Sequence, residues 1–335
     1  MKNVNSSLFG IHEIGSTGRQ LLIGYQSFIS LSALIGDTLV LIGTLKYNAI
    51  QLHEILIIFI QNIAVADILL TVFNILPGIV SLAANDWILG DILCHASYFV
   101  NSNCGLIITL LISALAATKV VIVKYPLRAL TFSSRIAHIS AGSMWICSFI
   151  IPAAAIAKDK RGVTFDLKVY NCLYNCRKET WTPMESVLFD IAWGMTVFTS
   201  TVVTVVSSVV LIVLAKRAAD RRSGGLQWQG VLTVLLTASL HLLISIPFFI
   251  YFIASFYFDQ RGELPLVYVD KIATDAWILS YLVVAVNFYT ITLTLSSFRE
   301  FLKRRIKMMI APLIQCCTAN GDQGPVEEGE RRRLL

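Results

Sequence analysis

Seven long apolar segments fill most of the chain, and they constrain its fold more than any single motif does. They lie at 21–45, 55–82, 92–123, 137–157, 186–215, 230–257 and 272–297. A helix needs about 20 apolar residues to cross the hydrocarbon core of a bilayer, and lipid offers no partner to an unpaired backbone group. We therefore expect an all-α membrane protein, a seven-transmembrane helix bundle over residues 21–297.

Composition agrees with this fold class and excludes others. Of the 335 residues, 56% are hydrophobic and only 14% are charged, which excludes a disordered chain and argues against a soluble globule. The formal net charge of +6 comes from loops that would attract anionic lipid, so membrane lipid is an expected partner and nucleic acid is not. The sequence contains no metal-ligand spacing, nucleotide-binding loop or nucleophile–base pattern, so we expect no enzymatic activity, no metal centre and no cofactor.

Lysine and arginine gather in the loops on one side of the predicted membrane. That side holds Lys46 and the basic residues of 124–135, 216–222 and 299–307. Short loops rich in lysine and arginine stay in the cytoplasm. The N-terminal segment 1–20 is therefore predicted to be extracellular, and Asn5 lies there in a glycosylation sequon, Asn5-Ser6-Ser7.

The C-terminal region predicts a helix on the membrane surface. Residues 298–310 place apolar side chains on one helical face and basic ones on the other, as interfacial helices do. Cys316 and Cys317 follow at the same surface and are expected to be palmitoylated; the alternative is two unmodified thiols. Residues 311–335 mix Gly, Pro, Glu and Arg without periodicity, so we expect a disordered cytoplasmic tail.

Several short motifs recur in a fixed order along the segments. The second segment reads Asn62-Ile63-Ala64-Val65-Ala66-Asp67, and Cys94 follows Trp87 by seven residues. Thr118-Lys119-Val120 lies at the inner end of the third segment, shortly before Pro126-Leu127, while Trp145, Pro247 and Asn287 lie in the fourth, sixth and seventh segments. In this order and spacing the chain resembles the rhodopsin-like (class A) G-protein-coupled receptor family over about residues 20–310.

The resemblance implies a plasma-membrane receptor that binds an extracellular ligand and activates a heterotrimeric G protein, with arrestin as a candidate partner. Asn101 stands where amine receptors carry aspartate, so a peptide or another non-amine ligand is favoured. One alternative is a weakly coupling receptor-like scaffold or decoy. A second alternative is a seven-span transporter, in which Asp37 and Asp67 would line the ion path.

Departures from the family's pattern concern the residues that switch conformation. Thr118-Lys119-Val120 stands in the Asp-Arg-Tyr place that the resemblance assigns to G-protein coupling. Phe288 and Ile291 replace the proline and tyrosine of the seventh segment, and Asp37 replaces the usual asparagine of the first. We therefore predict ligand-independent activity but a low maximal G-protein response.

Asp67 lies in an apolar run, where an ionised carboxylate is costly unless it is paired or hydrated. The resemblance implies that Asp67 binds a sodium ion and that Asp37 and Asn287 face the same cavity. Two neighbouring carboxylates oppose simultaneous ionisation. A sodium or proton site is thus one hypothesis, and a protonated, hydrogen-bonded structural pair is the other.

The outer half of the bundle is the expected ligand site, because pockets between helices combine apolar walls with a few polar groups. The candidate contact residues are His95, Tyr98, Asn101, Asp190, Trp193, Phe248, Phe249, Tyr251, Asp275, Trp277 and Tyr281. Aromatic residues at helical spacing also pack against one another, which is the alternative role for each of them.

Cys94 begins the third segment at the outer surface, and Cys172 and Cys176 lie in the long outer loop. The extracellular compartment favours disulfides, so we expect Cys94 to pair with one of the two. Residues 163–170 alternate as a strand would. A strand entering the loop favours Cys172, with Cys176 as the alternative.

Overall fold

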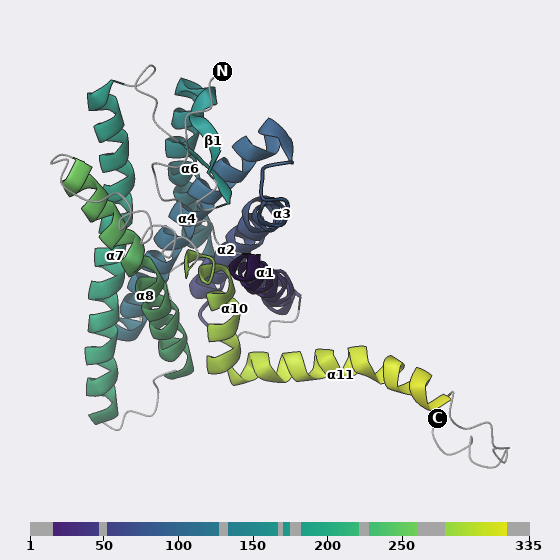
Figure 1. Cartoon of the computed structure of the whole chain (residues 1–335). Coiled ribbons are helices and arrows are strands. Elements are labelled where there is room, and N and C mark those ends of the chain that lie inside the picture. Colours follow the sequence, from purple (N-terminus) through teal and green to yellow (C-terminus); the bar gives the residue numbers. More distant parts are fainter. Residues whose placement is uncertain are drawn as a thin grey trace, which may run out of the picture.

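The computed structural model describes residues 16–46, 52–126, 133–166, 170–174, 182–220, 228–259 and 279–319. Figure 1 shows helices packed side by side into a bundle, with a small hairpin at one end and a C-terminal helix that leaves the bundle sideways. The elements are α1 (Ser16–Leu45), α2 (Glu54–Leu70), the π-helix η2 (Thr71–Ile75), α3 (Leu76–Ala84), α4 (Gly90–Lys124), α6 (Ser134–Lys158), the 3-10 helix η3 (Lys160–Gly162), β1 (Val163–Asp166), β2 (Asn171–Tyr174), α7 (Pro183–Asp220), α8 (Trp228–Asp259), α10 (Val283–Thr294) and α11 (Ser296–Ala319).

Among the described residues, six helical stretches are long and apolar enough to cross a membrane. They are Thr17–Leu45, Glu54–Ala84, Gly90–Lys124, Ser134–Lys158, Ile191–Arg217 and Trp228–Ile246. The shorter apolar helix α10 occupies the seventh predicted segment, whose first residues lie outside the described ones. The seven-helix membrane fold predicted from hydropathy is confirmed.

The second span is continuous but not uniform, because it passes from α2 through the π-helix η2 into α3. Pro77 occupies the first turn of α3 and has no N–H to donate to the preceding turn. A wider π turn just before the proline accommodates the missing bond. Asn74 of η2 is fully buried there, so the local widening delivers a polar side chain into the bundle.

The interior of the bundle is apolar around α4, which packs against α2, α6, α7 and α8. Leu56, Ile63, Ile107, Ile108 and Leu111 are almost completely buried there. Large apolar side chains on α6 and α7 point outward instead, among them Ile139, Phe198 and Val206. Such exposed apolar faces suit a lipid surround, since lipid tails are as apolar as the side chains that they meet.

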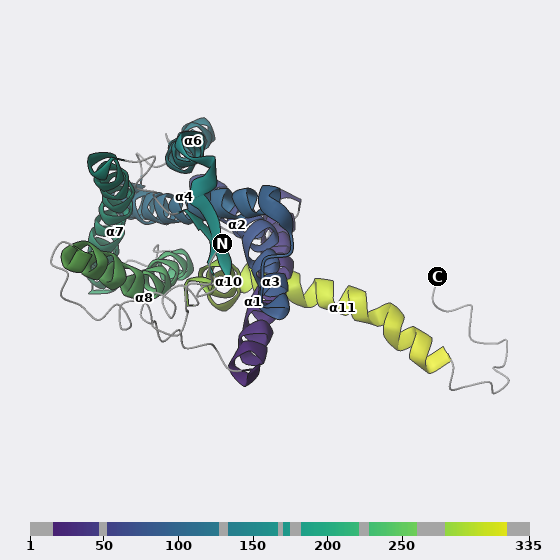
Figure 2. The ribbon, with the colours of Figure 1, turned by 45° about the horizontal axis from the view of Figure 1, so that its top comes forward.

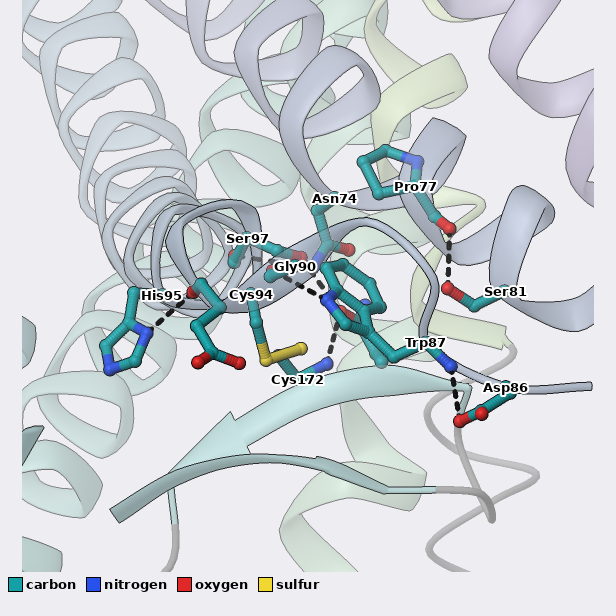
Figure 3. Close-up of a disulfide and its surroundings, with 12 residues drawn as sticks. Asn74, Pro77, Ser81, Asp86, Trp87, Gly90, Cys94, His95, Ser97 and Cys172 are labelled. Carbon is teal, nitrogen blue, oxygen red and sulfur yellow. Dashed lines mark hydrogen bonds between the residues drawn. A yellow bond between two sulfur atoms is a disulfide. The ribbon is translucent and has the colours of Figure 1, made fainter. Parts of the chain in front are cut away.

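An antiparallel hairpin of β1 and β2 lies across one end of the bundle (Figure 2) and packs against α4. Phe165 pairs with Cys172 in its register. Cys172 forms a disulfide with Cys94 of α4, with 5.4 Å between the Cα atoms (Figure 3). This is the pairing that the predicted strand favoured; Cys176 lies outside the described residues.

Helix α11 begins at Ser296 and ends at Ala319, past residue 310, where we expected the surface helix to end. Apolar residues recur beyond that point at Leu313 and Ile314, which extends the amphipathic pattern. Residues 320–335 lie outside the described ones.

Candidate functional site

Three polar side chains from three helices meet in the middle of the bundle. Asp37 of α1 and Asp67 of α2 are both completely buried, and Asn287 of α10 is 3% exposed. Asp37 lies close enough to Asp67 to act on it electrostatically, and Asn287 lies beside Asp37. The structure therefore brings together the three residues that we assigned to an ion or proton site.

The two carboxyl groups lack hydrogen-bond partners among the described residues, and so does Nδ2 of Asn287. Unpaired buried polar groups are costly, so the arrangement fits a bound cation or a shared proton. The described part of the chain contains no group of three or more His, Cys, Asp or Glu side chains that could hold a metal ion. Two carboxylates and one amide therefore suit a monovalent cation better than a transition metal.

A small cavity adjoins this cluster and is lined by Asn287, Thr237 and His241 together with Ile63, Ile108, Ile112, Val283 and Val286. His241 is buried, and neither of its ring nitrogens has a hydrogen-bond partner among the described residues. The cavity forms where α8 and α10 meet α2 and α4, so the sequence around His241 alone does not reveal it.

Near the C-terminal end of α4, Lys119 is 2% exposed, while Thr118 and Val120 are half-buried. A Cβ placed on Gly230 of α8 would lie 2.8 Å from Nζ of Lys119. The lysine thus occupies space that Gly230 leaves by having no side chain, and it holds α4 and α8 in close approach. Lys119 forms no ion pair with any described residue.

At the end of the bundle that carries the hairpin, the described ligand-site candidates converge only in part. Tyr98 and Tyr281 are buried, and His95, Asn101 and Trp193 are half-buried. Tyr98 packs on Tyr174 of β2, with 5.6 Å between the ring centroids. The side chains of four further candidates are not described: Asp190 of α7 and Phe248, Phe249 and Tyr251 of α8. Asp275 and Trp277 lie outside the described residues.

His95 connects the start of α4 to the loop before the hairpin. Its Nδ1 lies 2.7 Å from the carbonyl oxygen of Asp91, and its Nε2 lies 2.6 Å from the carbonyl oxygen of Lys160. Both neighbours are acceptors, so His95 is engaged with backbone on two sides. The His95 side chain is thus a contact between the bundle and the loop before the hairpin.

The predicted modification sites lie beyond what the structure describes. Asn5 is outside the described residues, and Cys316 and Cys317 belong to α11 with side chains that are not described. Glycosylation and palmitoylation therefore stay predictions.

Seven apolar helices, a hairpin tied by a disulfide to the third span, and a buried polar cluster at mid-bundle define a seven-helix membrane protein. Residues 36–289 match the family described as "7 transmembrane receptor (rhodopsin family)". The match covers well over half of the chain, which belongs to this family. The resemblance drawn from the motifs is confirmed, and the chain is a receptor-class protein rather than an enzyme.

Two individual relatives are distant from this chain in sequence. A QRFP-like peptide receptor from Branchiostoma floridae is 21% identical over 182 residues, which cover 54% of this chain and 47% of that receptor. The neuropeptide Y receptor type 5 of Rattus norvegicus is 25% identical over 130 residues, covering 39% of this chain and 28% of the relative. The aligned part thus spans less than half the length of these relatives.

Proposed function

We propose that the chain is a multi-pass plasma-membrane receptor that binds a peptide from outside and activates a heterotrimeric G protein. The observation that carries the proposal is the match of residues 36–289 to a receptor family, joined to relatives named as receptors for a peptide and for neuropeptide Y. Lys160 and Arg161 of η3 add two basic residues beside the hairpin, which suits a peptide with acidic groups.

In this mechanism, activation is a shift in the equilibrium between two arrangements of the same helices. A ligand shifts that equilibrium only by its difference in affinity for the two states. In the packing described here, Lys119 of α4 fills the space over Gly230 of α8, so the inner ends of the two helices are closed together. Activation requires this contact to open, because a G protein approaches from that side.

The proposal is tested by nucleotide exchange on G proteins in membranes that contain the full chain, with a library of secreted peptides as ligands. We expect at least one peptide to raise exchange above that of membranes lacking the chain. A peptide that binds saturably without raising exchange on any G-protein subtype would instead identify a binding protein without coupling.

A receptor-like scaffold or decoy is the second candidate, and one contact in particular favours it. Phe288 of α10 replaces the family's proline, and its ring lies 2.3 Å from the place a Cβ on Gly36 of α1 would take. The seventh helix is thus packed tightly onto α1 without a proline to kink it. The same exchange assay separates the two functions, because a decoy binds peptide and leaves exchange unchanged.

A further inference from the structure

We propose that Asn171, the first residue of β2 and the neighbour of the disulfide, is an internal occupant of the ligand pocket that an incoming ligand must displace. The polar subsite it fills consists of Asn74, Ser97 and Tyr281, from the second, third and seventh spans. The part of this inference that concerns ligand displacement rests on the proposed receptor function. The part that concerns occupancy of the subsite stands on the contacts alone.

A continuous chain of hydrogen bonds runs through the polar subsite. Nδ2 of Asn74 donates to Oγ of Ser97 at 3.2 Å, and Oγ of Ser97 donates to Oδ1 of Asn171 at 2.9 Å. Nδ2 of Asn171 then donates to the hydroxyl of Tyr281 at 3.1 Å. Asn74, Ser97 and Asn171 have no exposed surface, and Tyr281 is 3% exposed. One loop side chain therefore joins three spans inside the bundle.

The position of Asn171 is fixed by its chain neighbours. The backbone N–H of Cys172 donates to Oδ1 of Asn171 at 2.8 Å, and Cys172 is bridged to Cys94 (Figure 3). Tyr170, just before it, has a positive φ of 51°, which a bulky side chain rarely adopts. Its hydroxyl donates to Oδ1 of Asn85 at 3.3 Å. Such a backbone persists only where surrounding contacts impose it, and here it turns Asn171 into the bundle.

The polar subsite also has unused binding capacity. Oδ1 of Asn74 is buried without a hydrogen-bond partner among the described residues. An amide oxygen accepts from an N–H or O–H group, and leaving it unpaired is costly. A ligand that brings a donor to this oxygen gains a bond that Asn171 does not make. The subsite thus selects ligands whose inner end carries an N–H or O–H donor, and it rejects purely apolar ones.

Occupancy is measured by the reactivity of a cysteine placed in the subsite. In a Ser97→Cys receptor, the thiol should be shielded from a small membrane-impermeant methanethiosulfonate added outside intact cells. Adding Asn171→Ala should raise the rate of modification about tenfold or more, because two buried hydrogen bonds that hold the loop are lost. The chain with Ser97 intact gives the background from native cysteines such as Cys147, which is exposed.

Two further variants make the test specific. Thr164→Ala on β1 is the matched control, because Thr164 is exposed on the same hairpin and should leave the rate unchanged. Tyr281→Phe releases Nδ2 of Asn171 without altering the hairpin, and it should raise the rate less than Asn171→Ala does. If Asn171→Ala does not reach the cell surface, the modification rate of the Tyr281→Phe variant alone tests the proposal.

The outcomes separate the occupancy from the receptor function. An unchanged modification rate in both variants, with the Cys94–Cys172 bridge intact by mass mapping, would overturn the proposal even if peptides stimulate nucleotide exchange. A raised rate supports it, and a receptor that then never responds to any peptide would refute the proposed function alone. A Thr164→Ala rate as high as that of Asn171→Ala would also overturn it, since any loosening of the hairpin would suffice.

Discussion

At the scale of single residues, His95 links α4 to η3. One ring nitrogen lies 2.7 Å from the carbonyl oxygen of Asp91 in α4, and the other lies 2.6 Å from the carbonyl oxygen of Lys160 in η3. Replacing the imidazole therefore removes this contact between the two elements.

We predict that His95→Ala makes hydrogen exchange in residues 158–166 faster than in the wild type, because the variant loses the contact of the ring with the carbonyl oxygen of Lys160. Equal exchange rates in the two proteins would contradict this role of His95.

Asp67 supports a second prediction at this scale. Sodium at ten times its Kd should stabilise the purified receptor by about 1.4 kcal/mol relative to an equal concentration of a large organic cation. Asp67→Asn should abolish this difference, because it removes the charge and keeps the size. Melting curves in the two salts measure it. A wild type indifferent to sodium would show that Asp37 and Asp67 share a proton instead, and Asp37→Asn should then alter the pH dependence of signalling.

At the scale of elements, the contact between α4 and α8 supports a third prediction. Gly230→Ala would place a Cβ 2.8 Å from Nζ of Lys119 and 2.7 Å from Cδ2 of Leu52, so these two side chains must move and Lys119 loses its contact over Gly230. We expect ligand-independent nucleotide exchange to rise. Gly142→Ala in α6 is the matched control, because nothing lies within 4 Å of its added Cβ.

Both alanine variants gain about 1 kcal/mol of helix propensity, so a difference between them reports the contact and not the helix. Equal basal exchange in Gly230→Ala and Gly142→Ala, at equal surface levels, would show that this packing does not restrain the bundle.

Helices and strands were predictable wherever a regular pattern of apolar residues extended through the whole element. Hydropathy located the seven segments, and the alternation at 163–170 indicated the strand that became β1. The π turn at Thr71–Ile75 was not predictable from periodicity, because it depends on how Pro77 fits into an otherwise regular helix. The full length of α11 was missed because the polar composition of residues 311–335 outweighed the few apolar positions that extend the helix.

The functional site was predictable only where a charged residue lies in an apolar helix, because a charge is costly there. Two aspartates in apolar helices marked the ion or proton cluster. Asn171 and Gly230 escaped notice, because an asparagine in a loop and one glycine are ordinary in sequence. Their roles arise from contacts between elements far apart in the chain, such as Asn171 with Tyr281 and Gly230 with Lys119.

At the scale of the whole molecule, orientation follows from the loop charges and supports a fourth prediction. An epitope inserted before residue 10 should be stained by antibody on intact cells, and Asn5→Gln should increase the electrophoretic mobility by removing a glycan. Staining only after permeabilisation would reverse the topology and place the hairpin, the disulfide and the polar subsite on the cytoplasmic side.

Thr118-Lys119-Val120 departs from the family's Asp-Arg-Tyr pattern at the predicted cytoplasmic end of the third span. Arginine presents a planar fork of donors, whereas lysine presents a compact ammonium, and Lys119 is buried against α8 rather than paired with an acid among the described residues. Replacing the triplet through Thr118→Asp, Lys119→Arg and Val120→Tyr should therefore lower basal exchange and raise the ligand-stimulated response.

Nucleotide exchange on purified G protein, measured for the wild type and this triple variant at matched surface expression, tests the central claim that the chain is a coupling peptide receptor. We predict basal exchange above that of membranes lacking the chain, a small peptide-stimulated increase in the wild type, and a larger increase in the triple variant. Saturable peptide binding with no exchange above background in either protein would contradict it.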